Sequence, residues 1–152
     1  MEHEIDKLIS YGAIDGIITR QDVQTLVSQD INKEIYSLIK EIIKKDSLKV
    51  NEIYSKIANN TKDVMGIISL ISSTFRDLLT TAKLLKKGYS QNDIAKFYGV
   101  STGRAYYLVK DAKSFKLEDL EDNVNKLAEL DFKIKSGQID KNFGIELFLL
   151  QI

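Results

Sequence analysis

The chain of 152 residues contains no cysteine, no proline, no tryptophan and a single histidine. Without cysteine it can form no disulfide, no cysteine-ligated zinc site and no thiol nucleophile. The single histidine, His3, argues against a Ser-His-Asp triad and against a His-rich metal site. These absences argue against catalysis and favour a role in folding or binding.

Phosphate-binding and membrane signatures are also missing. Neither GxxxxGK[ST] nor GxGxxG occurs, so neither a phosphate-cradling loop nor a dinucleotide site is expected. Neighbouring acids such as Glu121 and Asp122 diverge on a helix rather than converge on a substrate. The longest apolar stretch, MGIISLISS, is too short to cross a bilayer, and no secretory signal is visible. We therefore predict no enzymatic activity, no cofactor, no metal and no membrane association.

The net charge is zero, with 22 basic and 22 acidic residues, but the charges are unevenly placed. Residues 83 to 116 carry eight basic and two acidic side chains, a net charge of +6. Residues 117 to 131 carry a net charge of −5. A free-standing DNA-binding domain is usually basic overall, because phosphate contacts supply most of its affinity. The balance favours adjacent solvated surfaces of opposite sign.

Apolar residues recur at intervals of three and four, which predicts an all-α chain. We expect a short helix at residues 2 to 11, then one starting at Thr19, then one over IYSLIKEIIKK at 35 to 45. Ser47 is expected to cap the next, which ends at NNT, and Thr61 the longest, to about Lys87. The wide apolar stripe of that helix is typical of the centre of a bundle. Helices from about 117 to 135 and 140 to 151 follow, the last with Phe143, Leu147 and Leu150 inward.

One stretch, YSQNDIAKFYGVSTGRAYYLVKDA at 89 to 112, has the layout of a helix-turn-helix. Ser90 and Asp93 resemble a capping pair, Gly99 ends the first helix and Ser101 starts the second. The second helix offers Thr102, Arg104, Tyr107 and Lys110 as exposed side chains and Ala105, Leu108, Val109 and Ala112 as a buried side. Such a corner either reads DNA or joins two helices by packing, and its residues alone leave both open.

The surrounding residues resemble a known family. STFRDLLTTAKLLKKGYSQNDIAKFYGVSTGRAYYLVKDAKSF, followed by LAELDFKIKSGQID, is similar to the C-terminal part of the bacterial DNA polymerase III delta subunit, a member of the sliding-clamp loader. The matching features are FR and LL on a long helix, KKG, DIAKFYGV, a basic helix ending near AKSF, and LDFKIKSG before an apolar tail. EIDKLISYGAIDGIITRQDVQTLV looks like the end of the lid domain of this AAA+ family.

The resemblance implies a piece of a longer protein, with residues 1 to 28 from the lid and 29 to 152 forming the helical collar. It implies a cytoplasmic, non-catalytic assembly domain. Its partners would be the other loader subunits, gamma or tau and delta prime. The sliding clamp would be reached only through an N-terminal domain not included here, and primed DNA only indirectly. Where relatives have Ser or Thr before the helix at 117, this chain has Lys116, which leaves the start of that helix in question.

No catalytic, cofactor or metal residue is predicted. The candidates for non-specific contact with DNA or a partner are Arg104, Lys110, Lys113 and Lys135, the last in a turn expected to face the opening of the collar. Phe143, Leu147, Phe148 and Leu150 are expected in the core rather than at an interface. Two alternatives stay open: a helix-turn-helix regulator that binds through residues 102 to 113, and a small stand-alone helical adaptor.

Overall fold

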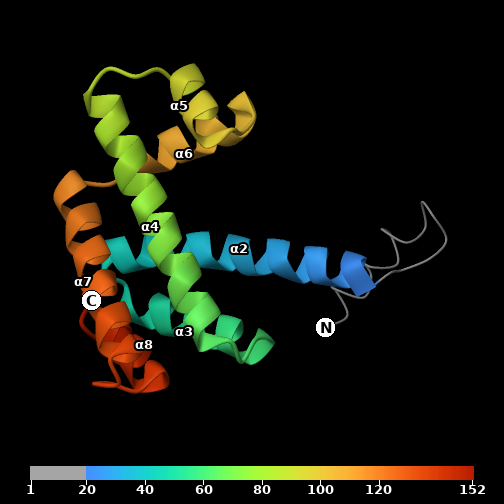
Figure 1. Cartoon of the computed structure of the whole chain (residues 1–152), viewed down its shortest axis with the longest axis vertical. Helices are drawn as coiled ribbons and strands as arrows, with labels where there is room; N and C mark the ends of the chain where they lie inside the picture. The colour runs from blue at the N-terminus through green and yellow to red at the C-terminus, as the bar shows by residue number, and fades with distance from the viewer. Residues whose placement is uncertain (1–19) are drawn as a thin grey trace.

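A computed structural model describes the backbone of residues 20–152 and the side chains from residue 30 onward. Within that range the chain forms helices and no strand (Figure 1). The helices are α2 (Arg20–Lys44), α3 (Ser47–Asn60), α4 (Val64–Lys86), α5 (Gln91–Tyr98), α6 (Thr102–Ser114), α7 (Leu117–Lys135) and α8 (Lys141–Leu150). The all-α prediction is confirmed for this range. The helix expected at 2 to 11 and the Thr19 cap lie outside it.

Helix α4 is the centre of the fold, as its wide apolar stripe predicts. It contacts α2, α6, α7 and α8. Figure 1 shows α7 running beside it, α2 crossing it steeply, α5 and α6 near one end, and α3 near the other. Phe75, Ile71 and Leu78 on α4 are almost completely buried. They belong to a core shared with α2, α3, α7 and α8, and we call these five helices the main bundle.

Helices α5 and α6 form a separate corner with a small core of its own, made of Ile94, Ala95, Ala105 and Val109. Ser90 and Asp93 form a complete capping box at the start of α5, and Gly99 ends α5 in the left-handed conformation at φ 63°. The hydroxyl of Ser101 accepts a hydrogen bond from the backbone N–H of Arg104. The predicted layout of the two helices is confirmed.

Two predicted caps are wrong by one or two residues. Asp46, not Ser47, begins α3 by accepting from the backbone N–H of Lys49. Asp63, not Thr61, begins α4 by accepting from the backbone N–H of Gly66 at 2.9 Å. In each pair the carboxylate is the side chain that reaches the free N–H groups of the first turn.

The structure also defines the start and end of α2 and of α7. The segments expected from residue 19 and from 35 to 45 are one helix, α2, with no break near residues 27 to 31. Helix α7 has the predicted bounds, and its N-cap residue Lys116 makes no side-chain capping bond. Ser114, the other candidate cap, donates its hydroxyl hydrogen to the carbonyl of Asp111 instead.

The last helix buries a different side from the one predicted. Gly144, Ile145, Phe148 and Leu149 are buried, which bears out Phe148 as a core residue. Phe143, Leu147 and Leu150, expected inward, are 59%, 37% and 72% exposed. Helix α8 is apolar on both sides, so its periodicity does not choose a face. Gly144 helps to choose it, because a Cβ there would lie 2.7 Å from Cδ1 of Leu130, which is too close for a larger residue without movement.

Candidate interaction surfaces

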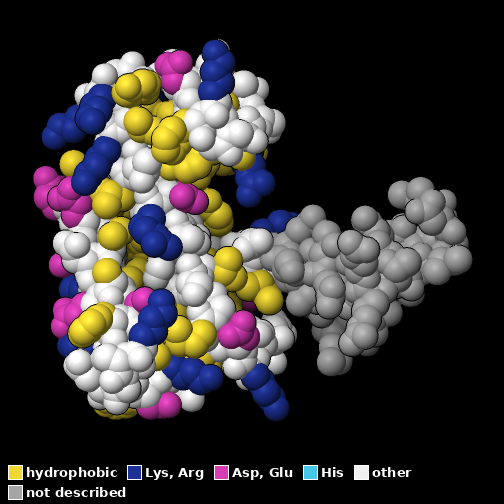
Figure 2. All heavy atoms as spheres, viewed as in Figure 1, with side chains coloured by type: hydrophobic (Ala, Val, Ile, Leu, Met, Phe, Trp, Pro, Cys, Tyr) yellow, Lys and Arg dark blue, Asp and Glu magenta, His cyan; other side chains and the backbone are white. Residues whose placement is uncertain are grey.

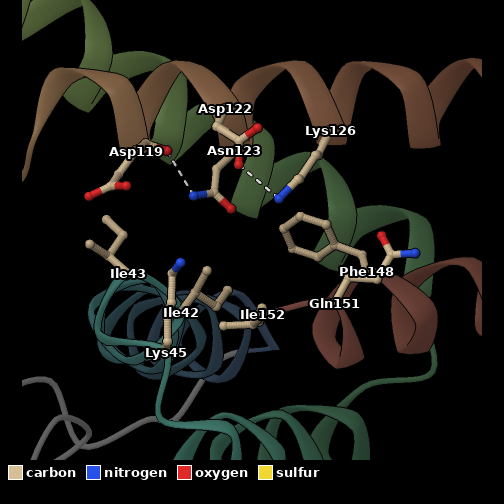
Figure 3. Close-up of a pocket in the computed structure, with 10 residues that line it drawn as sticks. All are labelled: Ile42, Ile43, Lys45, Asp119, Asp122, Asn123, Lys126, Phe148, Gln151 and Ile152. Atoms are coloured by element: carbon tan, nitrogen blue, oxygen red, sulfur yellow. Dashed lines mark hydrogen bonds and ion pairs between the residues drawn. The ribbon is translucent and has the colours of Figure 1, made fainter.

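The described side chains contain no group of three or more His, Asp or Glu residues that could hold a metal ion. A small pocket of about 60 Å³ lies where the end of α2, α7 and the last residues of the chain meet (Figure 3). Three of its polar side chains bond within α7: Lys126 pairs with Asp122 at 2.8 Å, and Asn123 donates to the carbonyl of Asp119. It is far smaller than the pockets that hold cofactors, so we look to the outer surfaces.

The four predicted contact residues do not form one surface. On a helix that turns about 100° per residue, Lys110 lies about 120° from Arg104 and Lys113 about 180° from it. Lys135 is on α7, and its ammonium pairs with Asp131 at 2.7 Å. Whether any of them contacts DNA or a partner stays a prediction, but no single ligand surface includes all four.

Helix α6 buries the predicted side chains, Ala105, Leu108, Val109 and Ala112, and exposes Tyr107 and Arg104. That exposed side faces another part of the same chain. Arg104 and Tyr107 lie across a groove from α2. A recognition helix has to enter the major groove of a duplex, and this placement does not favour such a docking.

We call the groove between α2 and α6 the α2–α6 groove. It has a volume of about 670 Å³. Lys40 Nζ and Asp111 Oδ1 approach to 3.5 Å across it. Burial raises the pKa of Tyr36, and the nearby carboxylates of Asp77 and Asp111 raise it further. The lining residues are Asn32, Lys33, Tyr36, Ser37 and Lys40 on α2, and Arg104, Tyr107, Leu108 and Asp111 on α6.

A second surface is the α8 stripe, formed by Phe143, Leu147 and Leu150. These residues lie at positions i, i+4 and i+7, so they share one side of α8, and all three are exposed. A shallow hollow of about 210 Å³ beside Leu147 extends onto α7, where Leu130 lines it together with the charged side chains of Lys126, Glu129 and Lys133. Contiguous exposed apolar surface often marks an interaction site.

The uneven charge of the sequence is partly neutralised by the fold. On α7, Asp122, Glu129 and Asp131 pair with lysines four residues later. Lys83 of α4 pairs with Glu121 of α7 at 2.9 Å, which joins the basic and acidic segments. Figure 2 accordingly shows basic and acidic side chains interspersed over one face of the molecule, with apolar side chains among them.

Sequence reasoning missed both surfaces. No local pattern could show that Lys33 and Lys40 would face Arg104, because that pairing depends on how α2 and α6 are placed by α4. The α8 stripe did leave a signal, since a helix that is apolar on both sides has one side more than its core contact needs.

Comparison with known proteins agrees with the fold. Residues 32–152 match the family model described as DNA polymerase III delta subunit, C-terminal domain. The chain is 32% identical over 149 residues to the DNA polymerase III subunit delta of Bacillus subtilis, covering 98% of this chain and 43% of that protein. The solved structure of the Bacillus subtilis DNA clamp loader delta protein superposes with a TM-score of 0.74 at 31% identity, covering 98% of this chain and 44% of that one.

The chain thus spans less than half the length of these relatives. Neither relative is named as a DNA-binding regulator. Among the residues that the structure describes, every helix is too short or too polar to cross a bilayer.

Proposed function

This chain belongs to the family of the DNA polymerase III delta subunit, and we propose that it acts as the assembly domain of a clamp-loader delta subunit. In this role it packs against the other loader subunits and performs no chemistry of its own. The observation that supports the proposal most is the match to the C-terminal domain of that family over residues 32–152.

The proposal divides the chain as the resemblance implies. Residues 1 to 28 would end the lid domain, and residues 29 to 152 would form the collar, which joins gamma or tau and delta prime in a ring. The clamp would be opened by an N-terminal domain not included here, and primed DNA would be met only indirectly. We place this work in the cytoplasm, where replication proteins of bacteria act.

The α8 stripe supplies a physical means of association. Exposed side chains of Phe and Leu at the centre of an interface stabilise association by leaving water. Phe143 and Leu150 are the two most exposed members of the stripe, so they lose the most exposed area if a partner covers it.

Co-purification tests the proposal with the full-length protein and the other loader subunits of the same organism. Replacing Phe143 and Leu150 by Glu is expected to weaken assembly by at least tenfold. Leu48, which is 82% exposed on α3, provides the control, and Leu48→Glu is expected to change assembly by less than twofold. If the unaltered full-length protein does not associate with those subunits, the proposal is wrong.

A further inference from the structure

The α2–α6 groove is long enough to hold a segment of another chain. Its lining runs from Asn32 to Lys40 on α2 and from Arg104 to Asp111 on α6. At about 1.5 Å of rise per residue these walls are about 12 Å and about 10 Å long. With a volume of about 670 Å³, the groove has room for several side chains.

The charge of the groove is positive but limited. Three basic side chains, Lys33, Lys40 and Arg104, face one acidic side chain, Asp111. Lys40 is already paired with Asp111 at 3.5 Å. Lys33 and Arg104 form no ion pair among the described residues, although Arg104 is close enough to the carboxylate of Asp77 to act on its pKa. They lie on opposite walls, so a bound segment would meet one unpaired cation on each side.

The floor of the groove is apolar, and each wall carries an aromatic ring. Leu108 is nearly buried at its base, and the ring of Tyr107 is 64% exposed. Tyr36 from α2 is half-buried and adds an aromatic surface opposite. An apolar side chain placed on Leu108 between the two rings would remove further apolar surface from water.

This combination suits a peptide better than a polynucleotide. A single nucleic-acid strand is bound along a continuous positive track with stacking platforms. Here only two cations are unpaired, Asp111 stands within the groove, and Lys110 and Lys113 point away from it. An amphipathic acidic segment instead matches both features, with carboxylates for the rim and an apolar side chain for the base.

We infer that the α2–α6 groove binds an acidic segment of a neighbouring clamp-loader subunit, with an apolar side chain on Leu108 and carboxylates beside Lys33 and Arg104. The inference rests on the proposed assembly function and adds the location and the chemistry of one contact. Complementary charge of this kind favours the correct neighbour and speeds its docking.

Photo-crosslinking identifies the occupant directly. A photoreactive benzoyl-phenylalanine in place of Tyr107, in full-length protein assembled with the other loader subunits, is expected to crosslink to one subunit. The crosslinked peptide should carry at least two Asp or Glu residues and an apolar residue. Crosslinking to DNA alone, to a basic peptide, or to no subunit of a fully assembled loader would overturn the inference.

Charge reversal measures how much the groove contributes. Lys33→Glu with Arg104→Glu is expected to weaken assembly about tenfold at low salt and less at high salt. The matched control is Lys62→Glu with Lys96→Glu. It changes the net charge equally, and both lysines are exposed outside the lining of the groove. Helix content by circular dichroism should equal that of the unaltered protein in both variants.

The outcomes separate this inference from the proposed function. If the α8 stripe variant prevents assembly while Lys33→Glu with Arg104→Glu assembles normally, the groove inference is wrong and the assembly function stands. If the unaltered protein does not assemble, both are wrong. If the groove variant assembles normally but loses at least tenfold in affinity for a fluorescent 20-nucleotide dT strand, the groove binds nucleic acid instead.

Discussion

The main bundle and the α5–α6 corner achieve stability in different ways. The bundle buries side chains from five helices, including the completely buried Phe75, Leu38 and Ile57. The core of the corner has four buried residues, and two of them are alanines, with the remaining cover supplied by partly buried residues such as Leu84 at the end of α4. Since apolar stabilisation grows with buried area, the corner cannot depend on burial to the same extent.

Hydrogen bonds compensate for part of the smaller buried apolar area of the corner. Both helices of the corner start at a serine cap, and α5 adds the reciprocal bond of Asp93. The phenol of Tyr98 ties the corner to α4. In the bundle, α7 begins at Lys116 with no side-chain cap and is held by packing. The bundle helices α3, α4 and α8 also start at aspartate caps, so the contrast is limited to α7: the bundle holds one uncapped helix start by packing, and the corner has none.

Truncating one buried isoleucine in each region is the strongest test of this contrast. Ile71 of the bundle and Ile94 of the corner are both 0% exposed, and each change to Ala should cost about 2–5 kcal/mol. Ile71→Ala should lower the free energy of global unfolding by that amount. Ile94→Ala should act mainly by opening the corner locally.

Hydrogen exchange with a parallel urea titration distinguishes the two effects. Ile94→Ala should speed exchange over residues 91–114 and leave α7 largely protected, whereas Ile71→Ala should speed it throughout. Equal loss of global stability in the two variants, with uniform exchange in both, would mean that the regions form one cooperative unit.

Removing the tie between corner and bundle should have a smaller effect. The hydroxyl of Tyr98 donates to the carbonyl of Asp77 at 3.0 Å and accepts from the buried hydroxyl of Thr81 at 3.3 Å. Tyr98→Phe should destabilise the corner by about 1 kcal/mol, measured by hydrogen exchange of α5. Tyr89→Phe, at an exposed tyrosine, serves as the control and should have almost no effect.

Substitutions at two helix starts should change the stability of the protein in opposite directions. Ser101→Ala removes the bond to the Arg104 N–H and should cost about 1 kcal/mol. Lys116→Ser offers α7 the cap that it lacks and should add up to about 1 kcal/mol. Thermal unfolding measures both, with Lys116→Ala to separate the new cap from the loss of the lysine. A gain from Lys116→Ala as large as that from Lys116→Ser would rule out capping as the cause.

The smallest expected effect concerns the pKa values of two aspartates, one at the start of α5 and one on α4. Hydrogen bonds from Ser90 lower the pKa of Asp93 below its ordinary 3.8, so its contribution to folding is present above the unfolded pKa and is lost as the pH falls through the folded one. Burial raises the pKa of Asp77, so its contribution is present below the unfolded pKa and is lost as the pH rises through the folded one.

Carboxyl NMR titration should therefore give midpoints on opposite sides of 3.8 for the two residues. Acid should loosen the start of α5, and Asp93→Asn should remove that pH dependence. An Asp93 midpoint at or above that of Asp77 would contradict the hydrogen-bonded cap.

Sequence-based predictions were correct where a feature depends on residues that are close together in the chain. Ser90, Gly99 and Ser101 were located correctly because caps and left-handed ends depend on neighbouring residues. The caps of α3 and α4 were missed because two acceptors lie within two positions of each other at each start, and only backbone geometry decides between them, as between Asp46 and Ser47.

Long-range features escaped prediction for a physical reason. The exposed side of α8 was assigned wrongly, because both of its sides are apolar and the close approach of Gly144 to Leu130 is a tertiary contact. The α2–α6 groove joins residues about 70 positions apart in the sequence, so no local pattern contains it. Arg104, Lys110 and Lys113 are close together in the sequence, but on α6 they point in different directions.

Helix α4 also limits how this fold can vary over evolution. Its 23 residues run without interruption from the main bundle to the corner, a distance of about 33 Å at 1.5 Å per residue. Inserting or deleting one residue near its middle would turn one end against the other by about 100° and separate the α2–α6 groove into two unrelated walls. Helix α4 should therefore keep its residue count among functional descendants.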